Sequence, residues 1–391
     1  MAEAYIVEAI RTAGGRRNGR LSGIHPTDLA GKVLSALVAR TGIDPAAIDD
    51  VIMGCVSQGG EQCTHVGRNA VLASTLPDSV PAVTIDRQCG SSQQAIQFAA
   101  QAVLSGTQDM VIAAGVESMS RVPMGSTINA YRAAGLNYVP WSEAALERYG
   151  VKQFDQFTGA QMIADKYGFT REAADAFALT SHQKGAAAVA AGAFAAEILP
   201  VEVTLPDGTR DVHRQDEGLR PDASLEALGG LKPVIEGAII TAGNASQVCD
   251  GASGVLIVNE RALKAHGLTP LARIDNLTVT AGDPVIMLEE PINATRRALA
   301  RAGRSIADID LYEVNEAFAP VPLAWLRELE ADPAKLNVHG GAIALGHPLG
   351  ASGAKLMATL VHALHRHGKR FGLQTMCEGG GIANVTIVER L

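Results

Sequence analysis

Two cysteines stand where a thiol could take part in catalysis. Cys89 lies in the segment QCGSS, between a strand-like and a helix-like stretch, and Cys377 lies in CEGGG. A thiol at the start of a helix faces the positive end of the helix dipole, which lowers its pKa and favours the nucleophilic thiolate. Taken alone, a cysteine is more often a small buried hydrophobic residue, so position alone leaves both interpretations open.

A histidine and an asparagine add a possible base and a possible polar anchor. His347 lies in a glycine-rich segment at 340–353, and Asn315 directly follows the apolar strand predicted at 311–314. The C-terminal end of a strand is where α/β proteins place their ligands. The three glycines after Glu378 can turn backbone N–H groups inward as an oxyanion site, or they can make only a turn. Asn315 alone could equally cap a helix.

Strand-like and helix-like segments alternate in the first third of the chain. Apolar strands are predicted at 5–9, 51–55, 83–86 and 110–115, and helices at 27–41 and 91–105. This alternation indicates an α/β protein with a mainly parallel sheet. After Ser118 the pattern changes to loop-like stretches at 121–139, a helical pattern with a start signal at Thr170, an alanine-rich helix near 181–191, and a Gly/Pro-broken segment at 206–237. Strands resume at 254–258 and 272–280, so the intervening residues are an insertion.

Two parts of the chain resemble each other in order and spacing. The segment from Ala36 to Gly54 resembles that from Ala298 to Asn315, with 12 residues separating Gly42 from Gly54 and Gly303 from Asn315. Cys89 lies 35 residues after Gly54, and His347 lies 32 residues after Asn315. Strand ends near Val116 and Cys377 give a third match. Three matches in order predict a duplicated α/β domain with an insertion in the first copy.

Length and composition exclude several classes of protein. A chain of 391 residues exceeds the roughly 250–300 residues of one hydrophobic core, and 47% hydrophobic with 19% charged residues excludes general disorder. A net charge of −8 disfavours nucleic-acid binding. Five cysteines without a CxxC pair predict neither a disulfide framework nor a zinc site. Without a signal-like start or an apolar run of about 18 residues, we expect a cytoplasmic protein that has no membrane partner and no metal.

Together, four motifs resemble those of the thiolase family over essentially the whole chain. They are QCGSS around Cys89, NEAFA from Asn315, GHPLGASG around His347 and CEGGG from Cys377, with Asn-Ala-Ser at 244–246 between them. The resemblance implies an α/β fold of two duplicated βαβαβαββ halves, stacked as five αβαβα layers, with an inserted loop domain that holds coenzyme A. The predicted units are an N-terminal half at 1–118, the inserted CoA-binding domain at 119–247, a return segment at 248–269 and a C-terminal half at 270–391.

The resemblance also implies a role for each residue. Cys89, deprotonated by His347, would attack the keto carbon of a 3-oxoacyl-CoA and keep the shortened acyl group. Cys377 would protonate the departing acetyl-CoA enolate and then activate the second CoA. Asn315 would position a water that holds the enolate oxygen with His347, while the N–H groups of Cys89 and Gly379 hold the tetrahedral oxyanion.

By the same resemblance, coenzyme A is a substrate and no cofactor is tightly bound. The predicted CoA and acyl contacts are Arg220, Ala242, Ser246, Met287, Ala317 and Phe318. Arg214 and Lys232 would add positive charge to the inserted domain, unless they only form a solvated loop. Gln156-Phe157 stands where Met-Gly is common in the family, and Leu288-Glu289-Glu290 lacks the usual glycines. Both differences concern the acyl pocket and leave the acyl chain open.

The resemblance is strongest to degradative, β-oxidation-type thiolases, including those of sterol ring breakdown, and implies a homo-oligomer, a dimer or a tetramer. A biosynthetic acetoacetyl-CoA thiolase would have the same catalytic residues. A decarboxylating 3-oxoacyl synthase shares the fold, but Cys377 in CEGGG argues against it. A non-catalytic acyl-CoA or lipid-binding protein on this fold would have no need of all four polar residues.

Overall fold

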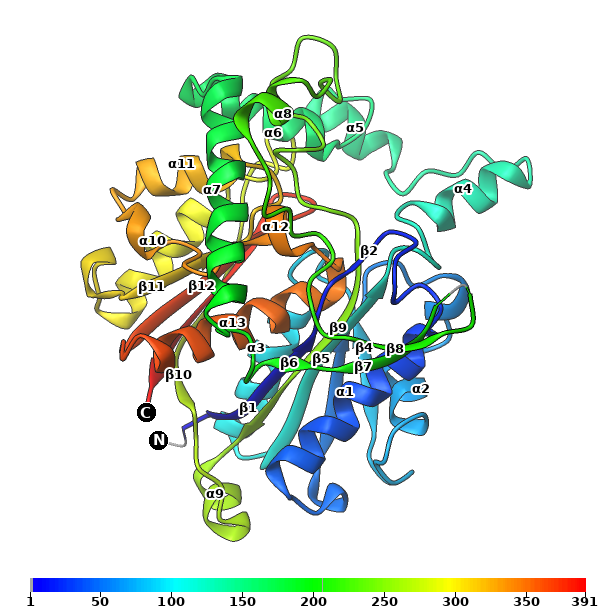
Figure 1. Ribbon diagram of the computed structural model, residues 1–391, viewed down its shortest axis with the longest axis vertical. Helices are drawn as coiled ribbons and strands as arrows, with labels where there is room; N and C mark the ends of the chain where they lie inside the picture. Colours follow the sequence, from blue (N-terminus) through cyan, green and yellow to red (C-terminus); the bar gives the residue numbers. More distant parts are fainter. Residues whose placement is uncertain (1–2, 206) are drawn as a thin grey trace.

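The computed structural model describes residues 3–205 and 207–391, and its first half is built on a five-stranded part of a larger sheet (Figure 1). The strand order is β4-β3-β5-β9-β1, in which β3, β4 and β5 are parallel and β9 is antiparallel to both its neighbours. The strands are β1 (Tyr5–Thr12), β3 (Asp50–Gly54), β4 (Ala82–Ile85), β5 (Met110–Ser118) and β9 (Cys249–Val258). The two-residue β2 (Gly15–Arg16) pairs with the start of β9.

The second half repeats this arrangement. Its strands are β10 (Ala272–Ala281), β11 (Leu311–Val314), β12 (Phe371–Glu378) and β13 (Ile382–Arg390), in the order β11-β12-β13-β10. β11 and β12 are parallel, and β13 is antiparallel to β12 and β10, as β9 is to β5 and β1. A short antiparallel pairing of β1 with β10 joins the two halves. The predicted duplication is therefore visible in the strand pairing.

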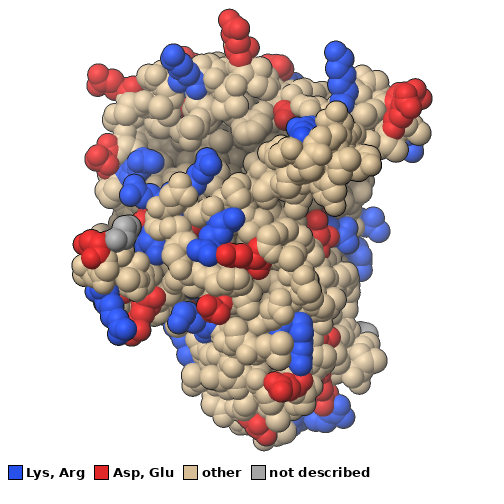
Figure 2. Space-filling view, turned by 90° about the vertical axis from the view of Figure 1, so that its right-hand side faces the viewer, with Lys and Arg blue, Asp and Glu red and all other residues tan. Residues whose placement is uncertain are grey.

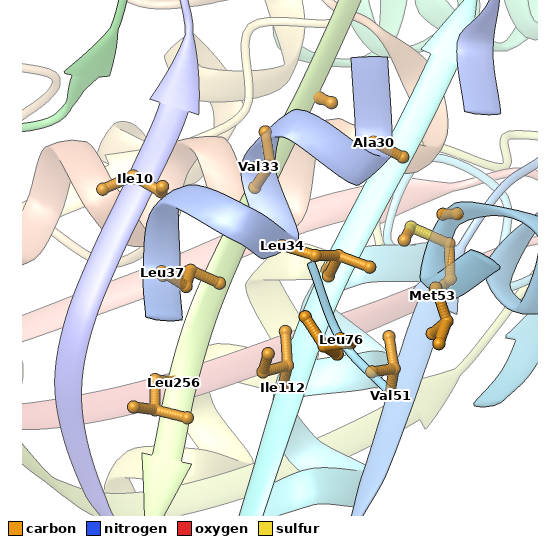
Figure 3. Close-up of a cluster of buried hydrophobic side chains, with 14 of the residues drawn as sticks. Ile10, Ala30, Val33, Leu34, Leu37, Val51, Met53, Leu76, Ile112 and Leu256 are labelled. Atoms are coloured by element: carbon orange, nitrogen blue, oxygen red, sulfur yellow. The ribbon is translucent and has the colours of Figure 1, made fainter. Parts of the chain in front are cut away.

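Helices cover both outer faces and fill the space between the halves. α1 (Pro26–Thr41) and α2 (Val66–Leu72) cover the first half, where Figure 3 shows Leu34 and Leu37 of α1 packed toward Ile112 and Leu256 of the sheet. α10 (Pro291–Ala302) and α11 (Pro320–Glu328) cover the second half. α3 (Ser91–Ser105) and α13 (Ser352–Arg366) pack together between the two sheet regions. Three apolar clusters hold the five predicted layers together, and the central one lies between α3, α13 and the strands of both halves. Burying each leucine in them contributes about 1.5–3 kcal/mol.

The two halves differ most in how their equivalent strands are connected. Residues 379–381 close the turn from β12 to β13, whereas residues 119–248 connect β5 to β9. This long connection contains α4 (Ser126–Ala133), α5 (Glu143–Tyr149), α6 (Gln156–Tyr167), α7 (Arg171–Ala190), β6 (Ile198–Leu199), the β7–β8 hairpin (Val201–Thr204, Arg210–His213) and α8 (Leu225–Gly229). In Figure 1, α4 and α5 project away from the body, and α7 runs along the second half.

Most predicted elements agree with the structure within a few residues. The helix at 91–105 and the strand at 311–314 have the predicted bounds, and Thr170 caps α7 by accepting the N–H of Ala173. The prediction of a loop at 121–139 was wrong, because α4 lies within it. None of the residues of α4 is buried, so no apolar stripe marked it in the sequence.

Two short helices complete the described chain: α9 (Glu260–His266) and α12 (Ala342–Leu345). Within residues 3–205 and 207–391, no helix has the length and hydrophobicity needed to span a membrane.

Candidate active site

Cys89 lies in a tight turn between β4 and α3. Gln88 has a left-handed φ of 49°, which is uncommon for a residue with a side chain. Its N–H donates to Asp86 Oδ1, and Ser91 Oγ donates to its carbonyl at 2.6 Å. Gly90 directly precedes the first residue of α3, so the half-buried Cys89 thiol stands at the N-terminus of the helix.

The Cys89 thiol does not have the lowered pKa that its helix position predicts. Burial, and then the negative charge of Glu378, raise the pKa of Cys89 to about 12. Desolvation of a thiolate therefore outweighs the helix dipole here. Because the thiol is protonated near neutral pH, a base must remove its proton during the reaction.

His347 is in the state that a base requires. Ser352 Oγ lies 2.6 Å from His347 Nδ1 and 3.0 Å from Pro348 O, to which it can donate its hydrogen. If it does so, Ser352 Oγ accepts the Nδ1 hydrogen and His347 Nε2 carries the lone pair. Nε2 has no partner among the described residues. Burial, and then the charge of Lys355, lower the pKa of His347 to about 3. The imidazole is therefore neutral at physiological pH.

Asn315 and Cys377 lie at the same edge of the sheet because β11 and β12 are parallel. Val314 pairs with Thr375, and the Asn315 N–H donates to Thr375 O at 3.0 Å. Neither polar atom of the buried Asn315 side chain has a partner within the described residues. Burial, and then the charge of Cys89, raise the pKa of Cys377 well above its usual value. The second thiol is therefore also protonated, and it lies within electrostatic range of the first.

Glycines allow these motifs to approach one another. A Cβ on Gly379 would lie 2.9 Å from Gln88 Oε1, and one on Gly90 would overlap the Glu378 carboxyl group. A Cβ on Gly353, in the first turn of α13, would lie 2.0 Å from the backbone N of Gln93 in α3. The turn after β12 thus packs on the turn that carries Cys89, and the helices that follow Cys89 and His347 touch at their N-terminal ends.

Comparison with known proteins identifies the family. The model of the thiolase N-terminal domain matches residues 4–261, and that of the thiolase C-terminal domain matches residues 268–390. The chain belongs to the thiolase family. It is an enzyme, an acetyl-CoA C-acyltransferase, and the non-catalytic alternative is not favoured.

Similarity extends over the full length of individual thiolases. The chain is 53% identical over 393 residues to steroid 3-ketoacyl-CoA thiolase FadA6 of Mycobacterium tuberculosis, covering 100% of this chain and 95% of that protein. It is 43% identical to a beta-ketoadipyl-CoA thiolase of Escherichia coli, covering 100% of both. The crystal structure of Bacillus anthracis acetyl-CoA acetyltransferase matches with a TM-score of 0.91 at 35% identity, covering 100% of this chain and 99% of that one. The thiolase fold predicted from the motifs is confirmed.

Several side chains that hold the His347 loop of this thiolase were not singled out in the sequence. Glu117 accepts the N–H of Gly350 at 2.9 Å, and Glu316 accepts the N–H of Ile343 at 3.1 Å. Gln247 accepts the His347 N–H on its carbonyl, while its side chain donates to Ile343 O. A carboxyl group at the end of the apolar strand β5 was the available signal for Glu117, because a buried acid requires partners.

Four of the predicted CoA and acyl contacts lie together near Asn315. The Ser246 N–H donates to Ala317 O at 2.9 Å, and the preceding residue forms a β-bridge with Phe318. Ala317, Phe318 and the buried Met287 share one apolar cluster. Ala242 lies four residues before Ser246 and is exposed.

The positively charged residues predicted in the inserted segment do not form one edge. Arg220 is exposed beside the middle of α7, and its backbone N–H donates to His182 Nδ1 at 3.3 Å. Arg214 lines a cavity of about 260 Å³ with Val189 and Phe194, at the C-terminal end of the same helix. Lys232 is exposed after α8. Figure 2 shows basic and acidic side chains interspersed on one face of the molecule. Arg220 follows Gly218 by two residues, and the Gly218 carbonyl accepts a hydrogen bond from Gln247 Nε2, in the segment before His347.

Proposed function

We propose that this thiolase cleaves a ring-bearing 3-oxoacyl-CoA with CoA, releasing acetyl-CoA and a shortened acyl-CoA through an acyl-Cys89 intermediate. The observation that carries the catalytic assignment is the buried Nε2 of His347, which has no partner among the described residues. The Nδ1 contact with Ser352 would direct the lone pair of a neutral ring to Nε2. A neutral base and a protonated thiol are the correct starting pair for general base catalysis.

Burial disfavours the charged form of both partners, the Cys89 thiolate and the protonated His347 ring. We therefore expect that a thiolate–imidazolium pair does not accumulate before the substrate binds. Nucleophilic attack on the keto carbon and proton transfer to Nε2 would then occur together. The N–H groups of Cys89 and Gly379 would hold the oxyanion, which compensates for the charge that develops in the dry site.

Cys377 would complete both half-reactions. When the C2–C3 bond breaks, its S–H gives a proton to C2 of the acetyl-CoA enolate, whose oxygen is held by His347 and the water on Asn315. The Cys377 thiolate then takes the proton of the incoming CoA thiol. That CoA thiolate attacks the acyl-Cys89 thioester, and Cys89 leaves as a thiolate that recovers its proton from His347. Every group returns to its initial protonation state.

The segment 119–247 would bind CoA. The N-terminal half would then comprise residues 1–118 and the return segment at 248–269, and the C-terminal half residues 270–391. The bond from Ser246 to Ala317 and the packing of Phe318 on α6 support this division. As a part of the same proposal, the enzyme would act in the cytoplasm, as a homodimer or homotetramer.

An apolar wall supports the ring-bearing acyl group. The Phe157 ring packs edge-to-face on Phe318 with centroids 5.2 Å apart, in the same cluster as Met287. The carboxylate of Glu289 is paired with Lys166 at 2.6 Å, so these two opposite charges offset each other and do not by themselves favour a carboxylated substrate. The similarity to a steroid 3-ketoacyl-CoA thiolase, at 53% identity, points in the same direction.

A substrate panel tests this specificity. Thiolysis of acetoacetyl-CoA, straight-chain, carboxylated and ring-bearing 3-oxoacyl-CoA should give the highest kcat/KM for a ring-bearing substrate. We expect a gap of at least about tenfold over acetoacetyl-CoA, or about 1.4 kcal/mol of transition-state binding. Phe157→Ala should reduce this preference, whereas Phe154→Ala, whose ring contacts Trp141 and Tyr149, should preserve it. If acetoacetyl-CoA gives the highest value, the enzyme is a short-chain acetyltransferase.

A further inference from the structure

Lys355 is a buried cation directly behind the His347 loop. Its side chain is 4% exposed, and Nζ donates to Leu345 O at 2.6 Å and to Gly346 O at 2.7 Å. These are the carbonyls of the two residues immediately before His347. Lys355 also lies on α13, the helix whose first residue, Ser352, fixes His347 Nδ1. One helix therefore holds both the ring and the preceding backbone of the predicted base.

The Leu345–Gly346 backbone, which Lys355 holds on one side, is closely packed on the opposite side. Gly346 has a left-handed φ of 81°, and a Cβ at this position would lie 2.6 Å from Cys249 Sγ. The backbone is therefore confined between the Cys249 side chain and the Lys355 ammonium group. If the ammonium group were removed, two buried carbonyls would lose a charge-assisted donor, and the chain would relax toward the vacated space.

A buried group of charges extends from Lys355 to other parts of the fold. Arg11 of β1 binds Glu197 through Nε at 2.5 Å and Asp216 through Nη1 at 2.8 Å, and all three side chains are buried. Asp216 also accepts the N–H of Gly14. Asp216 and Glu197 act on Lys355 through charge, and both favour its ionised form against the effect of burial. Two cations and two acids form a neutral set, so loss of Lys355 would leave a buried negative charge.

This set joins three regions of the chain. Arg11 comes from the first half, Glu197 and Asp216 from the inserted segment, and Lys355 from the second half. Thr359, one turn after Lys355 on α13, donates to Glu197 Oε1 at 2.8 Å. The backbone before His347 is thus connected through Lys355 to the segment that we propose to hold CoA.

We propose that Lys355 is a positioning residue for the thiolase reaction: by holding the Leu345 and Gly346 carbonyls, it aims His347 Nε2 at the Cys89 thiol. This inference rests on the proposed roles of Cys89 and His347. Lys355 does not touch the substrate in this account. Its removal should therefore slow the chemical steps while leaving the binding of both CoA substrates nearly unchanged.

The test compares Lys355→Met with Thr359→Val in the full-length enzyme. Methionine has a similar volume but cannot donate to the two carbonyls, whereas Thr359→Val removes a contact with the same charge group without touching the loop. Lys355→Met should lower kcat by about 10²-fold, the cost of roughly 1 Å of misplacement in an active site. KM for both substrates should change less than about threefold. Lys355→Arg keeps the charge and N–H donors, so it should retain more activity than Lys355→Met, and Thr359→Val should stay close to wild type.

Folding is measured for each variant by thermal melting and native mass. If Lys355→Met does not fold, Lys355→Leu, which also has no hydrogen-bond donor, replaces it with the same expected loss. A folded variant with kcat within threefold of wild type would overturn the proposal, as would an equal loss in Thr359→Val or a loss confined to KM. If wild type itself performs no thiolysis, the proposed function fails instead, so the two failures are distinguishable.

Discussion

β5 of the first half and β12 of the second half occupy equivalent places in the sheet but end in different chemistry. Gly115 is the last residue of β5 that pairs with β3, and Thr375 is the last residue of β12 that pairs with β11. Glu117 and Cys377 each lie two residues further along their strands. The Glu117 carboxyl group accepts the N–H groups of Val56, Ser57 and Gly350 and the side chain of Gln62. Glu117 is an anchor with partners on all sides, whereas Cys377 is a buried thiol close to a second thiol.

The neighbouring strands show the same contrast. β3 is followed by Cys55, which is part of the apolar core of the first half. β11 is followed by Asn315, whose amide has no partner among the described residues. Unpartnered buried polar groups cost stability, so they persist where a ligand or a reaction requires them. The comparison therefore suggests that the first half supplies the nucleophile and a fully bonded support, while the second half supplies the reactive polar atoms.

The largest expected effect is on Cys377. Cys377→Ser should lower kcat by about 10² to 10⁴-fold, because a serine hydroxyl is too weak an acid to exchange protons near neutral pH. CoA affinity should change little. Cys55→Ser is the matched control, since it also buries a hydroxyl group at a strand end. Steady-state kinetics measure both variants, and a Cys377→Ser enzyme within twofold of wild type would remove this thiol from the mechanism.

Substitution of Asn315 should mainly lower activity, whereas substitution of Glu117 should mainly lower stability. Asn315→Ala should lower kcat by on the order of 10²-fold with little loss of stability, since the side-chain amide has no partner among the described residues and is proposed to position the catalytic water. Glu117→Gln should lower the free energy of unfolding by about 1–3 kcal/mol, because an amide NH₂ would face several N–H donors. Kinetics and denaturant melts on both variants test the contrast. If Asn315→Ala is the less stable variant, the interpretation of unpartnered groups is wrong.

A pH-dependent effect is expected for Glu378, whose buried carboxyl oxygens have no partner within the described residues. Burial raises the pKa of Glu378 well above its usual value. Between pH 4.5 and the folded-state pKa, the folded protein keeps a proton that the unfolded chain releases, so this group lowers stability as pH rises, by at most about 1.4 kcal/mol per pH unit. As the pH rises from about 5 toward the folded-state pKa of Glu378, Glu378→Gln should therefore gain stability relative to wild type. Melts that show a constant difference over this range would contradict the raised pKa.

Much of the fold and the candidate site could be predicted from the sequence, because both depend on local patterns. The repeat around Gly42 and Gly303 predicted the duplication, and both glycines end their helices with a left-handed φ. The raised pKa of Cys89 could not be predicted, since the helix start is visible in the sequence but the burial and the nearby Glu378 are not. Contacts between separate segments, such as that of Lys355 with the His347 loop, could not be predicted from the sequence either, because they depend on tertiary packing.

The most direct test of the account is to identify the acylated thiol. Wild-type enzyme is incubated with acyl-CoA in the absence of free CoA, digested and examined by peptide mass spectrometry. We expect one acyl group per chain on Cys89, none on Cys89→Ala, and no thiolysis by that variant. An acyl group found on Cys377 instead would contradict the division of roles between the two halves.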